Sequence, residues 1–235
     1  MSGPSDPGAE GDPFQIVRNA RAKRARLTFD PSSGRARLVL PARAPLKSAI
    51  AWARGKADWI AEQRALMPQA LPFEPGMVIE VADERLELCW RPGPRRALVR
   101  DSGVLSAEGP PETLPRRVEA WLRRSALDLL TRETVEFAAK AGVTVEAVAV
   151  GDPRGRWGSC SARGAIRYSW RLILAPGFVR RATVAHEVAH RVHMHHGPAF
   201  HLAVAELLGA DPGPARAWLR REGARLHKVG RSNSS

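Results

Sequence analysis

Cysteine is scarce in this chain: only Cys89 and Cys160 occur among 235 residues. Two cysteines cannot form the several disulfides that hold small secreted domains together, so their scarcity favours a reducing compartment. The chain also lacks any run of about 20 apolar residues, the length that a membrane-spanning helix needs. Residues 1–13 contain no apolar signal segment and are predicted to be a disordered lead-in. We therefore expect a cytoplasmic protein with no membrane partner.

Acidic residues are in the minority. The chain has 24 Asp and Glu against 37 Lys and Arg, which gives a net charge of +13 and a pI of about 11.2. Such an excess attracts polyanions, so non-specific binding of nucleic acid is one expectation. The alternative is compositional, because nearly all the basic residues are arginines and no nucleic-acid-binding motif accompanies them. The sequence also has no internal repeat and no P-loop.

Histidine, in contrast, is concentrated in one segment, since six of the seven histidines lie between residues 186 and 201. In the sequence His186-Glu187-Val188-Ala189-His190, a helix would place the two histidines about 40° and about 6 Å apart. Both rings could then approach one zinc ion at about 2.1 Å. An HExxH motif on a helix predicts a zinc site in which Glu187 is the general base for a zinc-activated water.

The third zinc ligand depends on where that helix ends. On a continuous helix, His196 would lie about 15 Å along the axis from His186, too far to share an ion. His196 can therefore be a ligand only if the helix ends soon after His190 and the chain turns back. Metzincins use a glycine for this turn, whereas His193 stands at that position here. The spacing favours His196 as the third ligand, with His201 and Glu206 as the alternatives.

A second motif, with the sequence RWGSCS, lies at residues 156–161. It is followed by residues 170–176, by the HEVAH segment and by a later His-Gly-Pro-Ala-Phe. This ordered series of motifs resembles the YgjP-like metallopeptidase family. These are minimal zincins related to the SprT, Spartan and Wss proteases. The sequence of residues 56–60, KADWI, also fits the family's K-x-x-W-I. The resemblance covers most of residues 15–210.

The resemblance implies a zinc site formed by His186, His190 and His196, with Glu187 catalytic. It also implies that the RWGSC segment lies beside the active site. We expect this segment to contact a peptide or protein substrate through Arg156, Trp157, Gly158, Ser159 and Cys160. Apart from the resemblance, Cys160 is better explained as a small buried residue than as a nucleophile.

The periodicity of apolar residues predicts an α+β fold in which a catalytic half follows a β-rich half, and the resemblance implies that the catalytic half is a minimal zincin-type domain. The expected divisions are a β-rich region with one helix over 14–110, the catalytic domain over 111–228 and a flexible tail over 229–235. Strands are predicted within 14–40, 77–105, 143–150 and 165–174, and helices over 45–66, 113–141, 198–209 and 213–226, besides the one that carries the histidines. The oligomeric state stays open.

Three functions fit these features. The first is a zinc metallopeptidase. The second is a zinc hydrolase of another substrate, such as a nucleotide phosphoanhydride, whose phosphates would be held by Arg156, Arg167 or Arg171. The third is a basic nucleic-acid-associated protein with a structural zinc, although such a site has no need of a base at Glu187.

Overall fold

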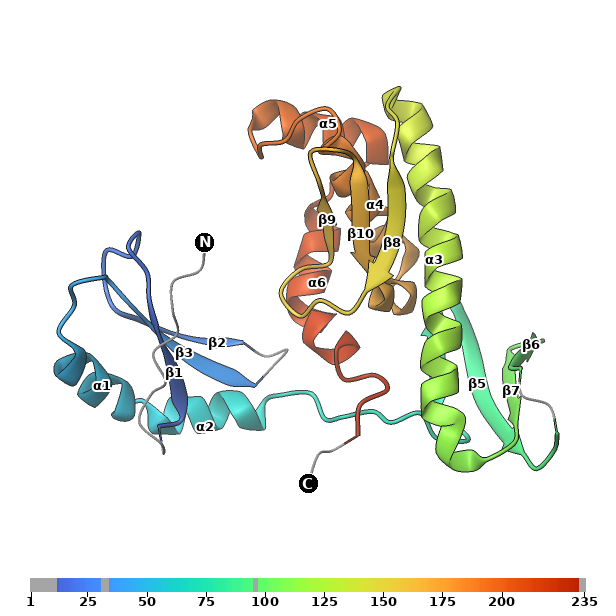
Figure 1. Cartoon of the computed structure of the whole chain (residues 1–235), viewed down its shortest axis with the longest axis horizontal. Coiled ribbons are helices and arrows are strands. Elements are labelled where there is room, and N and C mark those ends of the chain that lie inside the picture. Colours follow the sequence, from blue (N-terminus) through green and yellow to red (C-terminus); the bar gives the residue numbers. More distant parts are fainter. Residues whose placement is uncertain (1–11, 31–33, 95–96, 233–235) are drawn as a thin grey trace. The chain divides into compact units, whose positions relative to one another are not determined.

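A computed structural model describes residues 12–30, 34–94 and 97–232 of the chain (Figure 1). It has the expected α+β content, with small sheets and helices in both halves. The contacts divide the chain into two compact units, residues 1–68 and 69–235, which are described separately below. Except for Asp12 and Pro13, the predicted lead-in lies outside the described residues.

The N-terminal unit is a three-stranded sheet with two helices. Its elements are β1 (Phe14–Arg18), β2 (Arg26–Asp30), β3 (Arg35–Leu40), α1 (Leu46–Arg54) and α2 (Ala57–Ala65). The central strand β3 pairs with β1 in parallel and with β2 in antiparallel orientation. Every second side chain of β3 is buried, including Leu38 and Leu40, and these pack with Ala53 and Ile60 of the helices. The period-2 alternation of the sequence therefore separates a core face from a solvent face.

The C-terminal unit contains two sheets. The first has the order β4-β5-β7-β6 and consists of β4 (Val78–Val81), β5 (Glu84–Arg91), β6 (Val99–Asp101) and β7 (Val104–Glu108). The second has the order β8-β10-β9 and consists of β8 (Ala147–Gly151), β9 (Gly158–Cys160) and β10 (Ala165–Ser169). In Figure 1, α3 runs alongside β8 at one edge of this second sheet, and β9 forms the other edge.

Helices pack around both sheets of this unit. They are α3 (Leu114–Ala141), α4 (Gly177–Ala189), α5 (Pro198–Leu208) and α6 (Gly213–Leu226), with short 3₁₀ turns η1 (Pro111–Thr113) and η2 (Trp170–Leu174). The long helix α3 ends where the sequence indicates, because Gly142 takes the left-handed conformation with φ of 64°. Among the described residues, no helix combines the length and the apolarity needed to cross a membrane.

The boundary between the units lies after Pro68 and not near residue 110 as expected. The reason is that the strands β4 to β7 share one core with the helices that follow, so Ile79 and Leu105 belong to the same buried cluster as Leu122 and Val184. Asp83, in the β4–β5 turn, also accepts a hydrogen bond of 2.6 Å from the backbone N–H of Gly177, at the start of α4. Composition shifts and prolines near residue 110 cannot reveal such long-range packing.

Three smaller expectations need correction. The single helix predicted over 45–66 is two helices, because α1 ends at Arg54 and Gly55 follows as its C-cap. The strand predicted over 165–174 ends at Ser169 and continues as η2. The tail predicted from residue 229 begins with a buried residue, since Val229 is only 9% exposed and forms a bridge with Leu71. Residues 233–235 of that tail lie outside the described residues.

Candidate metal centre

The helix that carries the HExxH motif ends where a third ligand requires it to end. α4 finishes at Ala189, and His190 is its C-cap. The backbone N–H groups of Arg191 and His193 then bond back to the carbonyls of Val188 (2.8 Å) and Ala189 (2.9 Å), closing a tight turn before α5 begins at Pro198. No residue between 190 and 196 has a positive φ. The reversal thus needs no glycine, although metzincins use one there.

This turn brings three imidazoles together. Nε2 of His196 lies 3.2 Å from Nε2 of His186, and a ligand nitrogen of each of His186, His190 and His196 lies within 4.8 Å of the others. Within the described part of the chain, this is the only group of three or more His, Cys, Asp or Glu residues with such spacing. Neither His201 nor Glu206, the two alternatives considered for the third ligand, belongs to it.

The donor set fits a zinc ion. Two nitrogens at about 2.1 Å from a tetrahedral ion lie about 3.4 Å apart, close to the separation of the His186 and His196 nitrogens. Burial, together with the charges of His190 and His196, lowers the pKa of His186 to about 4, and burial also lowers the pKa of His190. Neutral imidazoles are the form that binds metal. Three such ligands leave one coordination position open.

The rings are held in place by neighbours that the motif itself does not contain. Nδ1 of His190 lies 3.2 Å from the carbonyl oxygen of His193, which orients its other nitrogen toward the cluster. Phe200, fully buried on α5, packs against all three rings at centroid distances of 4.6 to 4.9 Å. Sequence reasoning assigned Phe200 no role. A signal existed in the HGPAF segment, where Pro198 marks a helix start and places Phe200 in its first turn.

Glu187 is buried next to the cluster, with 5% of its surface exposed. Burial raises the pKa of its carboxyl to about 7, although the positive charge of Arg156 acts in the opposite direction. Its side chain lies directly against Gly158 of β9, where an added Cβ would approach Glu187 Cγ to 2.6 Å. Gly158 was expected to contact a substrate, and the structure shows that the absence of a side chain there makes room for the Glu187 carboxylate.

A cavity of about 270 Å³ opens beside His186 and Glu187. Of the RWGSC segment, Arg156, Trp157 and Gly158 line this cavity. Ser159 and Cys160 continue β9 but are absent from the lining. Burial raises the pKa of the Cys160 thiol; the charge of Glu187 raises it as well, whereas the charge of Arg191 lowers it. Cys160 is therefore not an activated thiolate.

One lining residue, Arg216, was not anticipated. It belongs to α6, and like Arg156 it is an exposed residue that lines the cavity. No local sequence signal marks Arg216, because its place depends on how α6 packs against α4. Trp157, in contrast, has a clear packing role: its ring stacks on His227 at 4.9 Å and lies against Gly223.

Two arginines that were considered as phosphate ligands are elsewhere. Arg171 is completely buried, and its guanidinium bonds to Asp152 (2.7 Å) and to the carbonyls of Leu226 (2.6 Å) and Val229 (2.7 Å). It holds the end of α6 in place, and its complete burial makes it inaccessible to a ligand. Arg167 is exposed on β10 and is not part of the cavity lining.

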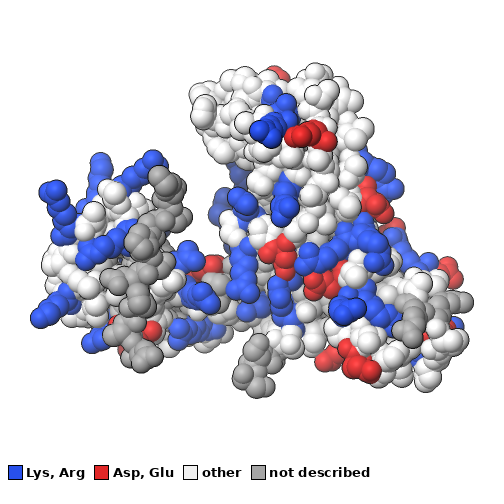
Figure 2. Space-filling view, in the orientation of Figure 1, with Lys and Arg blue, Asp and Glu red and all other residues white. Residues whose placement is uncertain are grey.

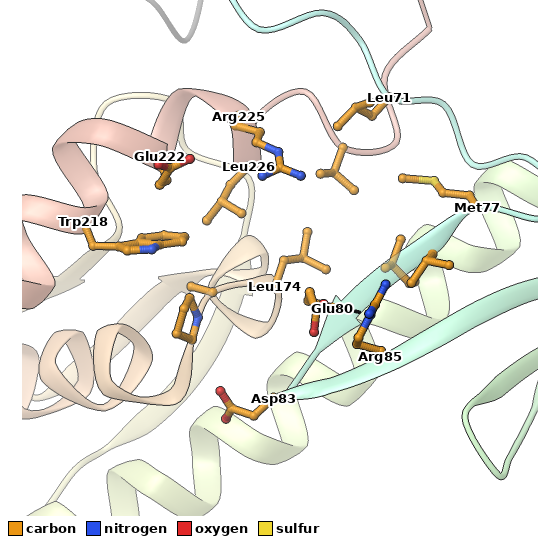
Figure 3. Close-up of a pocket in the computed structure, with 15 residues that line it drawn as sticks. Leu71, Met77, Glu80, Asp83, Arg85, Leu174, Trp218, Glu222, Arg225 and Leu226 are labelled. Carbon is orange, nitrogen blue, oxygen red and sulfur yellow. Dashed lines mark ion pairs between the residues drawn. The ribbon is translucent and has the colours of Figure 1, made fainter.

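A larger cavity, of about 580 Å³, lies elsewhere in the same unit between β4, η2 and α6. Figure 3 shows apolar side chains such as Leu174 and Leu226 around it, with Trp218 on one side and the exposed ion pair of Glu80 and Arg85 (3.4 Å) on another. No group of potential metal ligands lines it within the described residues. Size alone therefore does not identify the reactive centre, and the smaller cavity holds the groups with chemical capacity.

Comparison with known proteins agrees with this geometry. The family model of the YgjP-like metallopeptidase domain matches residues 23–222, which include the three clustered histidines, Glu187 and the RWGSC segment. No curated protein and no solved structure gives a significant match. Since the match covers most of the chain, the protein belongs to the YgjP-like family and carries its metallopeptidase domain.

Proposed function

We propose that this protein is a zinc-dependent metallopeptidase whose metal is bound by His186, His190 and His196. The observation that carries the proposal is the convergence of these three imidazoles beside a buried glutamate. A purely structural zinc site is closed by four protein ligands and needs no base, whereas this set has three ligands and places Glu187 next to them. The family match supports the same activity class.

A zinc ion bound here would supply Lewis-acid chemistry, which polarises a carbonyl group and makes water a stronger nucleophile. The chain's own contribution comes mainly from Glu187. Its carboxylate accepts the proton of the attacking water and passes it to the leaving amine. The Glu187 side chain is largely shielded from solvent, and its close contact with Gly158 of β9 limits where the carboxylate can lie.

The free edge of β9 supports a peptide as the substrate. In the β9–β10 pair, Ser169 N–H bonds to the Trp157 carbonyl (2.8 Å) and Ser161 N–H bonds to the Ala165 carbonyl (2.9 Å). The antiparallel pattern then directs the backbone groups of Gly158 and Cys160 away from β10. An extended peptide can add to such an edge as a further strand, which would place its backbone beside Glu187.

The test combines metal analysis with peptide hydrolysis. We expect Glu187→Gln to retain one zinc per chain and to lose activity by about 10² to 10⁴-fold, the usual contribution of a general base. His190→Ala should lose both zinc and activity. Glu206→Gln, an exposed glutamate outside the cluster, is the matched control and should behave as wild type. Full activity of Glu187→Gln would rule out the assigned base.

A second candidate has one specific observation in its favour. Arg156 and Arg216 both line the cavity and form no ion pair with described residues, so a negatively charged substrate such as a nucleotide phosphoanhydride also fits. Release of phosphate or pyrophosphate from nucleotides, lost in Glu187→Gln while no peptide is cleaved, would favour this candidate. A protein that binds zinc but shows neither reaction would leave the third candidate, a nucleic-acid-associated protein with a structural zinc.

A further inference from the structure

We propose that the N-terminal unit binds nucleic acid through the outward face of its three-stranded sheet and the adjoining β1–β2 connection. We call this surface the basic face, and it comprises Arg21, Lys23, Arg24, Arg26, Arg35 and Arg37. It belongs to a different unit from the metal centre, so the proposal does not depend on the catalytic one.

The strand register places three of these arginines on one side of the sheet. Arg35 and Arg37 alternate with buried residues of β3, so both point away from the core. Arg26 of β2 lies opposite Val39, which has the same orientation as Arg37. The opposite side of the sheet is occupied, because its apolar residues pack against α1 and α2. The arginines therefore lie on the side that the core of this unit does not use.

These side chains are also free. All six residues of the basic face are exposed, and within the described structure their charged groups form no ion pair or hydrogen bond; Arg21 and Arg37 are bonded to other side chains only through their backbones. Other arginines of the unit are used internally: Arg54 pairs with Asp12 at 2.8 Å, and Arg18 donates to the carbonyl of Ala42 at 2.7 Å. Along the described strands, the basic face includes one acidic residue, Asp30, opposite Arg35.

Net positive charge is denser along this unit than along the rest of the chain, at +6 over residues 1–68 against +7 over residues 69–235. Its described residues include twelve Lys and Arg but only four Asp and Glu. Figure 2 shows the same bias, since blue side chains far outnumber red ones on the visible part of the N-terminal unit.

The chemistry of the basic face favours the phosphate backbone of a nucleic acid. Guanidinium groups bind phosphate oxygens in pairs, and an array of them releases condensed counterions from a polyanion. The outward positions of β1 to β3 carry no aromatic side chain for stacking on bases, so binding should depend little on sequence. For the same reason these strands offer no large apolar group to insert into a lipid surface.

The test measures binding of a fluorescently labelled 20-base-pair duplex, and of one of its single strands, to the full chain by anisotropy at several salt concentrations. Arg26→Gln, Arg35→Gln and Arg37→Gln are combined in one variant. The matched control combines Arg43→Gln, Lys47→Gln and Lys56→Gln, which removes the same charge from exposed positions of the same unit outside the basic face. Zinc content and peptide hydrolysis without nucleic acid are recorded for both variants.

We expect the first variant to bind duplex at least about tenfold more weakly and to reduce the slope of log K against log salt by about 2 to 3, one unit for each lost phosphate contact. The control should stay close to wild type. Equal losses in both variants would show that only the net charge matters and would overturn the proposal. Binding to vesicles of anionic lipid without binding to the duplex would overturn it as well.

Discussion

The two units of this protein use charged residues in opposite ways. In the C-terminal unit, two arginines are buried and paired: Arg171 is completely buried and bonds to Asp152 at 2.7 Å, and Arg180 is 5% exposed and bonds to Glu133 at 3.0 Å. In the N-terminal unit, the six residues of the basic face are exposed and free of ion pairs. Buried charge fixes the geometry around a reactive site, whereas exposed charge stays available to a partner and is screened by salt.

This comparison makes a simple prediction about substitutions. A charge removed from one of the buried ion pairs of the C-terminal unit leaves its partner buried without compensation, so the folded state should be less stable. A charge removed from the basic face leaves nothing buried, so the fold should be unaffected and only binding should change. Three of the four predictions below test this contrast, and the second tests the packing around Glu187; they begin with the largest expected effect.

Arg171→Met should lower the free energy of unfolding by about 3 to 5 kcal/mol. The change leaves Asp152 and the carbonyls of Leu226 and Val229 without their buried donor, and loss of one partner from a buried pair has a cost of this size. Chemical denaturation measures the effect. Arg167→Met, an exposed arginine on β10, is the control and should change stability by less than about 0.5 kcal/mol. Similar values for both would remove the distinction between the two kinds of charge.

Gly158→Ala should reduce peptide hydrolysis about 10 to 100-fold, because its Cβ displaces the Glu187 carboxylate from the position where it takes a proton. Gly155→Ala is the matched control, since an added Cβ there meets no atom within 4 Å. Zinc content is measured for both variants, and we expect it to be unchanged. If Gly158→Ala retained wild-type activity, close contact between β9 and Glu187 would not be needed for function.

Asp152→Asn should lower stability at pH 7 by about 1 to 3 kcal/mol, because Arg171 would keep a weaker, neutral partner. Burial raises the pKa of Asp152, but hydrogen bonding and the charge of Arg171 outweigh it, so the folded pKa lies below its usual value. A carboxyl whose pKa is lower in the folded chain stabilises the fold at pH values above its pKa in the unfolded chain, about 4. This stabilisation is lost as the pH falls through the pKa of the folded chain.

The pH dependence separates this effect from simple loss of packing. Denaturation midpoints of wild type and Asp152→Asn should differ at pH 7 and converge as the pH falls below about 4. A constant difference across this range would show that the charge of Asp152 is not what matters.

The combined variant Arg26→Gln, Arg35→Gln and Arg37→Gln should change the free energy of unfolding by less than about 0.5 kcal/mol per site. These side chains are exposed and bury no partner. Thermal or chemical denaturation of the N-terminal unit within the full chain checks this. A loss of several kcal/mol would mean that the arginines stabilise the sheet and would weaken the contrast between the two units.

Local features of the fold could be predicted from the sequence because they depend on neighbours along the chain. Apolar spacing and a terminal glycine predict a helix over 113–141, and the structure has α3 over Leu114–Ala141 with Gly142 in the left-handed conformation. The helices predicted over 198–209 and 213–226 correspond to α5 and α6 within one residue. Two other features depend on residues far apart in the chain: β1 pairs with β3 in parallel, and β4 to β7 belong to the core of the C-terminal unit. The periodicity of apolar residues contains no information about such non-local contacts.

The sequence by itself determined the chemistry available at the candidate site, because two histidines four residues apart on a helix must share a face, with Glu187 between them. Only the tertiary structure decided the rest. The turn after His190 brings His196, and not His201 or Glu206, beside His186 and His190, and the packing of α5 places Phe200 against the three rings. Likewise, α6 brings Arg216 to the cavity. These choices depend on contacts between segments distant in the chain, and such contacts exist only once the core has formed.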